Sequence, residues 1–198
     1  MFAYIKGELV LKANTYVVID VQGIGYKIHM SQKAIELLGE IGEIVKVYTY
    51  HYVREDNISL YGFITNEELR MFELLLSVSG IGAKLALTIL SERTPASFVL
   101  AVITNDVSKL VNIPGIGAKS AARIILELKD KLKALSAFSQ EETEAEAIKE
   151  DTKTTEAIAA LQVLGYTRKE IEKALEKVDL EKLGLEDIIR KALALLAK

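Results

Sequence analysis

The chain contains Val78-Ser79-Gly80-Ile81-Gly82-Ala83-Lys84-Leu85-Ala86 and repeats this pattern 35 positions later as Ile113-Pro114-Gly115-Ile116-Gly117-Ala118-Lys119-Ser120-Ala121. Each copy stands between two segments of helical periodicity. The two glycines permit a tight turn with positive φ and a close approach of the main chain to a ligand, while the apolar residue between them anchors the turn in the core. Ala86 and Ala121 are small, as two closely crossing helices require. The repeat therefore predicts two hairpins, each joining two helices.

The helix that follows each hairpin is expected to begin at the surface, with unpaired N–H groups and the positive end of its dipole facing outward. Such a helix start binds phosphate. Lysines follow the second glycines, and Arg123 lies one turn beyond Lys119, within reach of a second phosphate. Because amides and lysines contact phosphates and not base edges, we expect DNA binding that is insensitive to sequence and steeply weakened by salt. The candidate phosphate-binding residues are Ser79, Gly80, Gly82, Lys84, Gly115, Gly117, Lys119 and Arg123.

Other glycine motifs fit this segment less well. A single Gly-x-Gly turn equally often joins two helices without binding anything, but two full copies favour DNA. A phosphate-binding NTPase loop needs a glycine directly before Lys-Ser, whereas Ala118 precedes Lys119 and Ser120. A dinucleotide fingerprint needs a preceding strand, where this chain predicts a helix. Neither hairpin is therefore predicted to be a nucleotide pocket.

Composition limits the classes of protein to which the chain can belong. Its 198 residues suit two or three small domains, and 50% of them are hydrophobic, enough for real cores. Cysteine is absent and His29 and His51 are the only imidazoles, which excludes disulfides and thiolate metal sites and argues against any metal site. The sequence has no apolar run of about 18 residues and no signal-like start, so we expect a soluble, cytoplasmic protein without a membrane partner.

The net charge of −3 is unusual for a nucleic-acid binder, but the charge is unevenly distributed. Residues 1–64 carry 6 basic and 7 acidic side chains, and residues 135–198 carry 10 and 14. Residues 65–134, which contain both hairpins, carry 9 and 7 and are the only net positive segment, at +2.

The first 64 residues alternate in the manner of strands and are rich in β-branched and aromatic types, as in residues 15–21 and 44–53. About five short strands, with one helical interruption near Gln32 to Leu38, would make a small closed barrel. An oligonucleotide-binding (OB) barrel is the expected member of that class. The predicted fold class is thus multidomain α+β, with this barrel as domain 1–64.

The remainder of the chain is predicted to be helical. From Asn66, which we expect to cap the first helix, a period of 3.6 residues begins a helical hairpin domain over 65–135. The acidic segment 136–153 has few large apolar groups and predicts a flexible linker. Three short amphipathic helices within 154–198, the first ended by Gly165, suffice for a small three-helix bundle.

An acidic turn, Arg54-Glu55-Asp56-Asn57, separates two apolar runs and is predicted to be the tip of a hairpin. Polar turns usually have no function. In a phosphate binder, however, Glu55 and Asp56 would repel the DNA backbone, and repulsion is a route to discrimination between substrates. Tyr48, Tyr50 and Tyr52 share one face of a strand, where they either pack as ordinary aromatic residues or stack on bases.

Taken together, these features resemble the RuvA family, the Holliday-junction-binding subunits of bacterial branch-migration complexes, over essentially the full length. The hairpins alone are shared with many repair proteins, but their order with the other motifs is far more specific. The matching segments are 1–7, Gly23-Ile24-Gly25-Tyr26, Val53-Arg54-Glu55-Asp56, Leu60-Tyr61-Gly62-Phe63, both hairpins and Ala160-Leu161-Gln162-Val163-Leu164-Gly165-Tyr166.

The resemblance implies an OB barrel, a double helix-hairpin-helix domain and a mobile three-helix domain. It also implies a homotetramer, with an octamer as the alternative, in which Glu55 and Asp56 form a central acidic pin. The last domain would bind the hexameric RuvB ATPase, so that ATP is used by the motor and this chain needs no cofactor. The RuvC resolvase would share the junction. The residues that represent the motor-binding domain are Leu161, Leu164, Gly165, Tyr166 and Ile189.

One departure and two rival functions stay open at this stage. Position 118, expected to be basic in some relatives, is alanine, which predicts a weaker second hairpin that relies on Lys119 and Arg123. One rival is a general duplex or single-strand binder without junction preference. The other is a helix-hairpin-helix glycosylase or nuclease. Glycosylases usually keep an aspartate shortly after the hairpin, where this chain offers only Glu92 and Glu127.

Overall fold

The computed structural model describes residues 1–55, 57–140, 152–180 and 182–196. By its internal contacts the chain forms two compact units, Met1–Thr94 and Pro95–Lys198. The division differs from the predicted domain 65–135, because the first two helices after the barrel belong to the first unit and the next three to the second.

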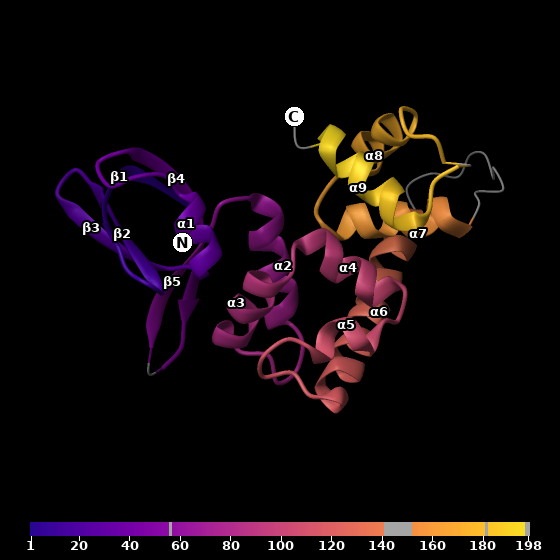
Figure 1. The fold of residues 1–198 in the computed structure, drawn as a ribbon, viewed down its shortest axis with the longest axis horizontal. Helices are drawn as coiled ribbons and strands as arrows, with labels where there is room; N and C mark the ends of the chain where they lie inside the picture. The colour runs from indigo at the N-terminus through magenta and orange to yellow at the C-terminus, as the bar shows by residue number, and fades with distance from the viewer. Residues whose placement is uncertain (56, 141–151, 181, 197–198) are drawn as a thin grey trace. The chain divides into compact units, whose positions relative to one another are not determined.

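The first unit begins with a closed barrel in the strand order β1-β2-β3-β5-β4 (Figure 1). Only β3 and β5 pair in parallel, and the other neighbours are antiparallel. Helix α1 (Gln32–Leu37) lies between β3 and β4 in the chain, where the sequence predicts it. The predicted five-stranded OB-like barrel is therefore confirmed. Its strands are β1 (Tyr4–Lys12), β2 (Tyr16–Val21), β3 (Ile24–His29), β4 (Ile44–Val53) and β5 (Ile58–Phe63).

Strand alternation accounts for the barrel interior. Successive side chains of a strand point to opposite faces, so one residue in two faces the core. The side chains that are fully buried include Leu9, Val17, Ile19, Ile28 and Val47. The long hairpin of β4 and β5 projects beyond the barrel in Figure 1, and Val53 pairs with Ile58 near its end.

Two helices complete the first unit: α2 (Asn66–Leu76) and α3 (Ala83–Glu92). The predicted cap of α2 was wrong by one residue. Thr65, which has extended backbone, accepts a hydrogen bond from the amide of Glu68, whose carboxylate accepts from Thr65 in return. This reciprocal capping box satisfies two unpaired amides, whereas Asn66 is already helical. Helix α2 buries Met71, Phe72 and Leu75.

The second unit contains α4 (Pro95–Ile103), α5 (Val107–Val111) and α6 (Ala118–Gln140), followed by α7 (Thr152–Val163), α8 (Arg168–Leu175) and α9 (Leu185–Leu196). Helix α6 is longer than predicted, because alanine and glutamine after Leu135 favour a helix and no breaker follows. The predicted linker 136–153 thus begins inside α6 and ends inside α7. Its central part, 141–151, lies outside the described residues.

The last three helices pack against one another as the predicted three-helix bundle. Gly165 ends the α7 segment with a φ of +94°, and the amide of Tyr166 donates to the carbonyl of Leu161 over 3.2 Å. Left-handed backbone at this position is readily adopted by glycine. The buried core includes Ile158, Leu161, Leu164, Ile171, Leu175, Ile188 and Ile189.

Within the described residues, none of the helices is by itself both long and apolar enough to cross a membrane. The bent pair Ala83–Glu92 and Pro95–Ile103 meets the length and composition required only when the two helices are taken together.

Candidate nucleic-acid interface

The first hairpin joins α2 to α3 with the geometry that its sequence predicts. Gly80 adopts a φ of +82°, a left-handed conformation that a residue with a Cβ rarely adopts. The amide of Ile81 donates to the carbonyl of Val78 over 3.1 Å, and both side chains are buried. The apolar residue therefore anchors the turn, and Gly80 and Gly82 remain exposed beside it.

The second hairpin, between α5 and α6, repeats this geometry. Gly115 has a φ of +87°, and the amide of Ile116 donates to the carbonyl of Ile113 over 3.0 Å. The first helical bonds also match, since Ala86 donates to Gly82 over 3.0 Å and Ala121 to Gly117 over 2.9 Å. Both alanines are completely buried, as close helix crossing requires. The internal repeat of the sequence is thus a repeat of structure.

The two glycines of a hairpin are present for different reasons. The positive φ at positions 80 and 115 favours glycine there. Gly82 has extended backbone, with φ −94° and ψ 170°, and a Cβ added there would meet nothing within 4 Å. Gly117 likewise has no positive φ, and a Cβ added there would also meet nothing within 4 Å. The chain itself therefore does not need glycine at 82 and 117, whereas a ligand that approaches the main chain closely would.

Helix α3 lacks the side-chain cap that several other helices of the chain have. A side-chain oxygen caps α1, α2, α5 and α8, supplied by Ser31, Thr65, Asp106 and Thr167. Helix α3 instead begins at Gly82, with no side-chain hydrogen bond to its first amides. Those amides are donors that an external phosphate can satisfy.

Positive charge lies beside each helix start. Lys84 and Lys119 are exposed in the first turns of α3 and α6, and Ala118, also exposed, adds none. Arg123 lies one turn further along α6 and forms an ion pair with Glu127, with Nε and Oε1 3.7 Å apart. The sequence prediction missed this pair, although the spacing of four residues on a helix is its usual signal. A phosphate at Arg123 would share the guanidinium with Glu127.

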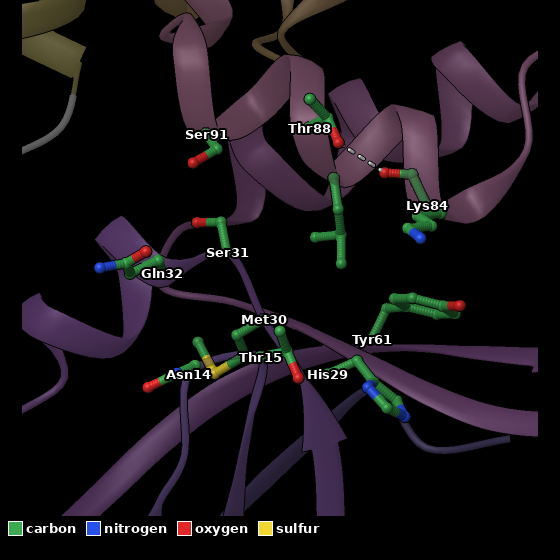
Figure 2. A pocket seen from close by; sticks show the side chains of 11 residues that line it. Asn14, Thr15, His29, Met30, Ser31, Gln32, Tyr61, Lys84, Thr88 and Ser91 are labelled. Carbon is green, nitrogen blue, oxygen red and sulfur yellow. Dashed lines mark hydrogen bonds between the residues drawn. The ribbon is translucent and has the colours of Figure 1, made fainter. Parts of the chain in front are cut away.

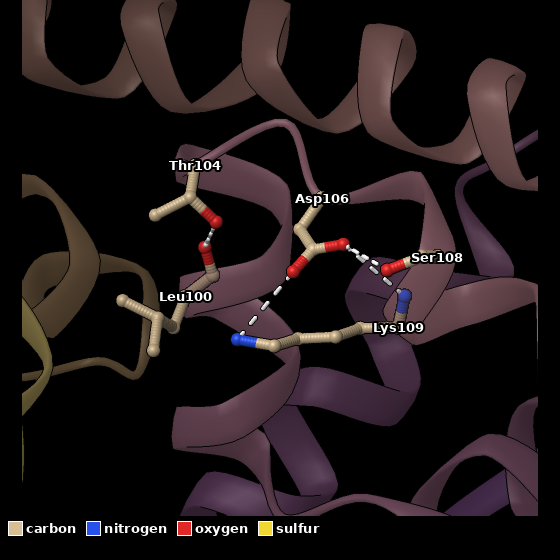
Figure 3. A network of polar contacts seen from close by, with 5 residues as sticks. All are labelled: Leu100, Thr104, Asp106, Ser108 and Lys109. Carbon is tan, nitrogen blue, oxygen red and sulfur yellow. Dashed lines mark hydrogen bonds and ion pairs between the residues drawn. The ribbon is translucent and has the colours of Figure 1, made fainter.

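A small polar network fixes the helix that leads into the second hairpin (Figure 3). Asp106 caps α5, and its carboxylate accepts from the hydroxyl of Ser108 over 2.5 Å and from the amide of Lys109 over 3.3 Å. The hydrogen bond from Ser108, together with those from Lys109 and its positive charge, lowers the pKa of Asp106. Asn105 precedes the cap with a φ of +56°. Asparagine tolerates this conformation better than most residues.

The acidic turn lies at the tip of the β4–β5 hairpin, as alternation predicts. The amide of Arg54 donates to the carbonyl of Asn57 over 2.8 Å and closes the turn. Glu55 is exposed there. Asp56 lies outside the described residues.

The residues chosen for the motor-binding domain have mixed positions. Leu161, Leu164 and Ile189 are buried in the three-helix core, so they hold the domain together rather than offer a surface. Gly165 and Tyr166 are partly exposed at the end of α7. A partner would meet exposed neighbours of the buried residues.

The strand tyrosines have separate surroundings. Tyr50 packs edge-on against Phe72 of α2, with ring centroids 5.4 Å apart. Tyr48 lies beneath the ammonium of Lys46, and Tyr52 contacts Tyr61. Packing, one of the two interpretations open from the sequence, therefore accounts for Tyr50.

A cavity of about 510 Å³ lies between the barrel and α3 (Figure 2). His29 and Tyr61 line it from the barrel, and Lys84, Leu87 and Thr88 line it from the helix. Burial, and then the positive charge of Lys27, lower the pKa of His29 below the ordinary 6.5, against a backbone hydrogen bond at Thr15 that raises it. From the sequence, His29 is predicted to be an ordinary strand residue, because only the fold brings α3 over it.

Among the described residues there is no group of three or more histidine, aspartate or glutamate side chains placed to hold a metal ion. The first carboxylates after each hairpin in the sequence differ in their surroundings: Glu92 is exposed near the end of α3, and Glu127 pairs with Arg123.

Comparison with known families follows this architecture. The model described as "RuvA N terminal domain" matches residues 1–62, "SAM-like Helix-hairpin-helix tandem" matches 72–130, and "RuvA, C-terminal domain" matches 152–197. This chain belongs to the RuvA family. The barrel and the tandem hairpins are thus domains that this family member shares with the family models.

Relatives of the chain match along its whole length. A protein of Acetivibrio thermocellus is 51% identical over 201 residues, covering 100% of both chains. One of Clostridium perfringens is 45% identical over 202 residues, again covering 100% of both, and one of Ruminiclostridium cellulolyticum is 42% identical and covers 98% of both. Each is named Holliday junction branch migration complex subunit RuvA.

The lowered pKa of His29 predicts a pH dependence of folding stability. The folded protein favours the neutral imidazole, so the unfolded chain binds more protons near pH 6.5. The stabilisation is complete above the unfolded pKa and is lost as pH falls through 6.5 toward the lower folded value. Urea unfolding between about pH 7.5 and 5.5 should show a larger loss of stability in the wild type than in His29→Gln. An equal change of folding stability with pH in the two proteins would contradict this assignment.

Proposed function

We propose that this protein binds four-way (Holliday) junction DNA without regard to its sequence and recruits the RuvB ATPase for branch migration in recombination and repair. The observation that carries the proposal is the open main chain at Gly82 and Gly117, where neither conformation nor packing requires glycine. The names of the relatives support the junction as the substrate.

The hairpins account for affinity without sequence specificity. A phosphate at the start of α3 would accept hydrogen bonds from first-turn amides and meet the charge of Lys84. The second hairpin would hold another phosphate with Lys119 and Arg123. Because these groups contact the backbone alone, every duplex arm is bound alike.

The acidic turn accounts for the choice of DNA structure. Glu55, at the end of a projecting hairpin, would repel a continuous duplex that passes across it. A junction that is open at its centre has room for the turn, which would separate the strands there. Asp56 would act together with Glu55.

The assembly that fits this role is a homotetramer, with one subunit for each arm of the junction, and an octamer would enclose the DNA from both sides. RuvC would share the junction for resolution. Chemistry belongs to the partner: the motor uses ATP, and this subunit needs no cofactor and no catalytic site of its own. The place of action is the cytoplasm, where bacterial DNA lies.

The rival that remains closest is a general duplex or single-strand binder. Competition binding at matched salt separates the two functions, because equal affinity for linear duplex and four-way junction would rule out junction recognition. Incision of a labelled junction by the purified chain with a divalent metal would instead revive an enzyme of the nuclease or glycosylase class.

Replacing the second glycines tests the phosphate sites. In Gly82→Ala with Gly117→Ala, the new methyl groups meet nothing in the chain, so unfolding should change by no more than about 1 kcal/mol for each helix start. Junction affinity should fall roughly tenfold or more, since a hydrogen bond to a charged group contributes about 1.5–3 kcal/mol.

Gly184→Ala is the matched control for this pair. Gly184 stands at the start of α9, where Ile188 donates to its carbonyl over 3.0 Å, and it too has nothing within 4 Å of an added Cβ. This variant should bind the junction as the wild type does. Unchanged junction affinity in the double hairpin variant would refute the phosphate sites.

Neutralising the acidic turn tests substrate choice. We expect Glu55→Gln with Asp56→Asn to bind linear duplex more tightly and to lose preference for the junction, because the repulsion is gone. The measurement is the ratio of the two dissociation constants at several salt concentrations. Glu40→Gln, a change at an exposed acidic residue of the same barrel, is the control. A ratio that does not change removes the turn from recognition.

Deleting residues 154–198 tests the role of the last domain. The truncated chain should retain junction binding, because both hairpins and the barrel remain, and should fail to stimulate the RuvB ATPase on junction DNA. Junction affinity and ATP hydrolysis are measured on the same preparation. Loss of DNA binding after this deletion would show that the three-helix domain is part of the DNA site.

A further inference from the structure

Four ring side chains form a row across the outside of the barrel. Tyr16 on β2 contacts His29 on β3, with ring centroids 6.2 Å apart, and His29 contacts Tyr61 on β5 at 5.7 Å. Tyr61 in turn contacts Tyr52 on β4 at 5.8 Å. We call these four residues the ring row. It crosses four neighbouring strands, because β5 lies between β3 and β4 in the barrel.

Strand register produces the row. Tyr16 is the direct cross-strand partner of His29, and His29 that of Tyr61. Tyr52 pairs with Ser59, two positions from Tyr61, which makes the last contact a diagonal one. Directly opposed and diagonal side chains are within contact distance on one face of a sheet.

The ring row faces outward and is partly exposed. Val17 and Ile28, the strand neighbours of Tyr16 and His29, are completely buried in the barrel. Successive side chains on a strand point to opposite faces, so the rings lie on the outer surface. Each of the four is half-buried, so part of each residue is open to solvent.

A cation lies at each end of the row. The ammonium of Lys27 is 4.2 Å from the ring centroid of Tyr16. At the other end the guanidinium of Arg54 lies 5.1 Å from the centroid of Tyr52, and its Nε donates to the Tyr52 hydroxyl over 3.0 Å. Arg54 is also the first residue of the acidic turn, so the row leads away from that turn.

The middle of the row forms one wall of the cavity under α3. Figure 2 shows His29 and Tyr61 on the barrel side and Lys84 on the helix side. None of the residues that line this cavity is an aspartate or a glutamate. The cavity therefore combines ring faces with one exposed lysine and no carboxylate to repel a phosphate.

We propose that the ring row binds single-stranded DNA, with bases on the four rings and phosphates near Lys27, Arg54 and Lys84. Every base has a flat face, so such stacking tolerates any sequence, and a cationic path beside the rings follows the backbone. The proposal rests on the proposed function, because the single strand is the one separated at the acidic turn. OB folds bind oligonucleotides on the face of their second and third strands, and the ring row includes Tyr16 on β2 and His29 on β3.

Packing alone does not explain the row. The rings that join the barrel to α2 are Tyr50, Tyr61 and Phe63, each in contact with Phe72. Tyr16 and Tyr52 make ring contacts with His29 and Tyr61 within the row, together with a cation at each end. The neutral form of His29, which its lowered pKa favours, stacks without the cost of a buried charge.

The test uses the full-length protein and a labelled 12-nucleotide oligothymidylate at low salt. Tyr16→Leu with Tyr52→Leu should weaken binding roughly fivefold or more, the effect of losing a stacked base. Tyr16→Phe with Tyr52→Phe keeps the rings and should bind nearly as the wild type does. Tryptophan is absent from the chain, so emission comes from its 8 tyrosines, and quenching by the oligonucleotide that is lost in the leucine variant reports stacking on Tyr16 and Tyr52.

A second cluster on the same barrel supplies the control. Tyr4 and Tyr48 pair across β1 and β4, and Lys46 lies 4.6 and 4.7 Å above their rings. Tyr4→Leu with Tyr48→Leu removes as much aromatic surface from outside the row and should leave oligonucleotide binding unchanged. Thermal unfolding of each variant shows that the barrel is intact.

Four-way junction affinity is measured on the same proteins, so the two proposals fail separately. A wild type that does not bind the junction contradicts the proposed function. A wild type that binds the junction but not the oligonucleotide overturns the ring-row proposal, and so does a folded leucine variant that binds the oligonucleotide normally. A change of oligomeric mass in the leucine variant would assign the row to subunit contact and also overturn it.

Discussion

The proposed phosphate sites depend on backbone amides that have no hydrogen-bond partner inside the helix that they begin. A helix leaves its first amides without internal partners, and most helix starts in this protein with a described cap satisfy them with a serine, threonine or aspartate. At Gly82 the chain leaves them open, beside an exposed lysine. Burial of Ile81 and Ala86 anchors the turn in the core beneath these exposed amides. Packing of the hairpin thus supports an outer surface that is left to the ligand.

Binding and discrimination are carried out by different parts of the chain. The hairpins offer amides and cations, which attract any nucleic-acid backbone. The acidic turn offers the opposite charge at the end of a projecting strand pair, where it acts only on DNA that reaches it. The low overall charge of −3 is consistent with this division, because only the segment that holds the hairpins carries a net positive charge. Specificity then depends on the positions of attractive and repulsive groups in the assembly.

Much of the fold could be predicted from local patterns, since they carry physical causes. Alternation gave β4 its bounds of Ile44–Val53, and the repeated glycines gave both hairpins. The different tasks of Gly80 and Gly82 could not be separated, because φ and the space around a Cβ are properties of the folded chain. The ring row could not be predicted either, because it depends on the register of four strands. Periodicity along a single strand indicates Tyr48, Tyr50 and Tyr52 instead. The extension of α6 beyond Leu135 could not be predicted, because the acidic composition of 136–153 favours a linker.

Amide hydrogen exchange of the full-length protein, with and without saturating four-way junction DNA, tests the central claim most directly. If phosphates are held by the hairpin amides, exchange at Ala83, Lys84 and Leu85, and at the equivalent residues 118–120, should slow markedly in the complex. The first turn of α8, which Thr167 already caps, serves as the internal reference and should not change. Unaltered exchange at both hairpins while the junction is fully bound would contradict the account.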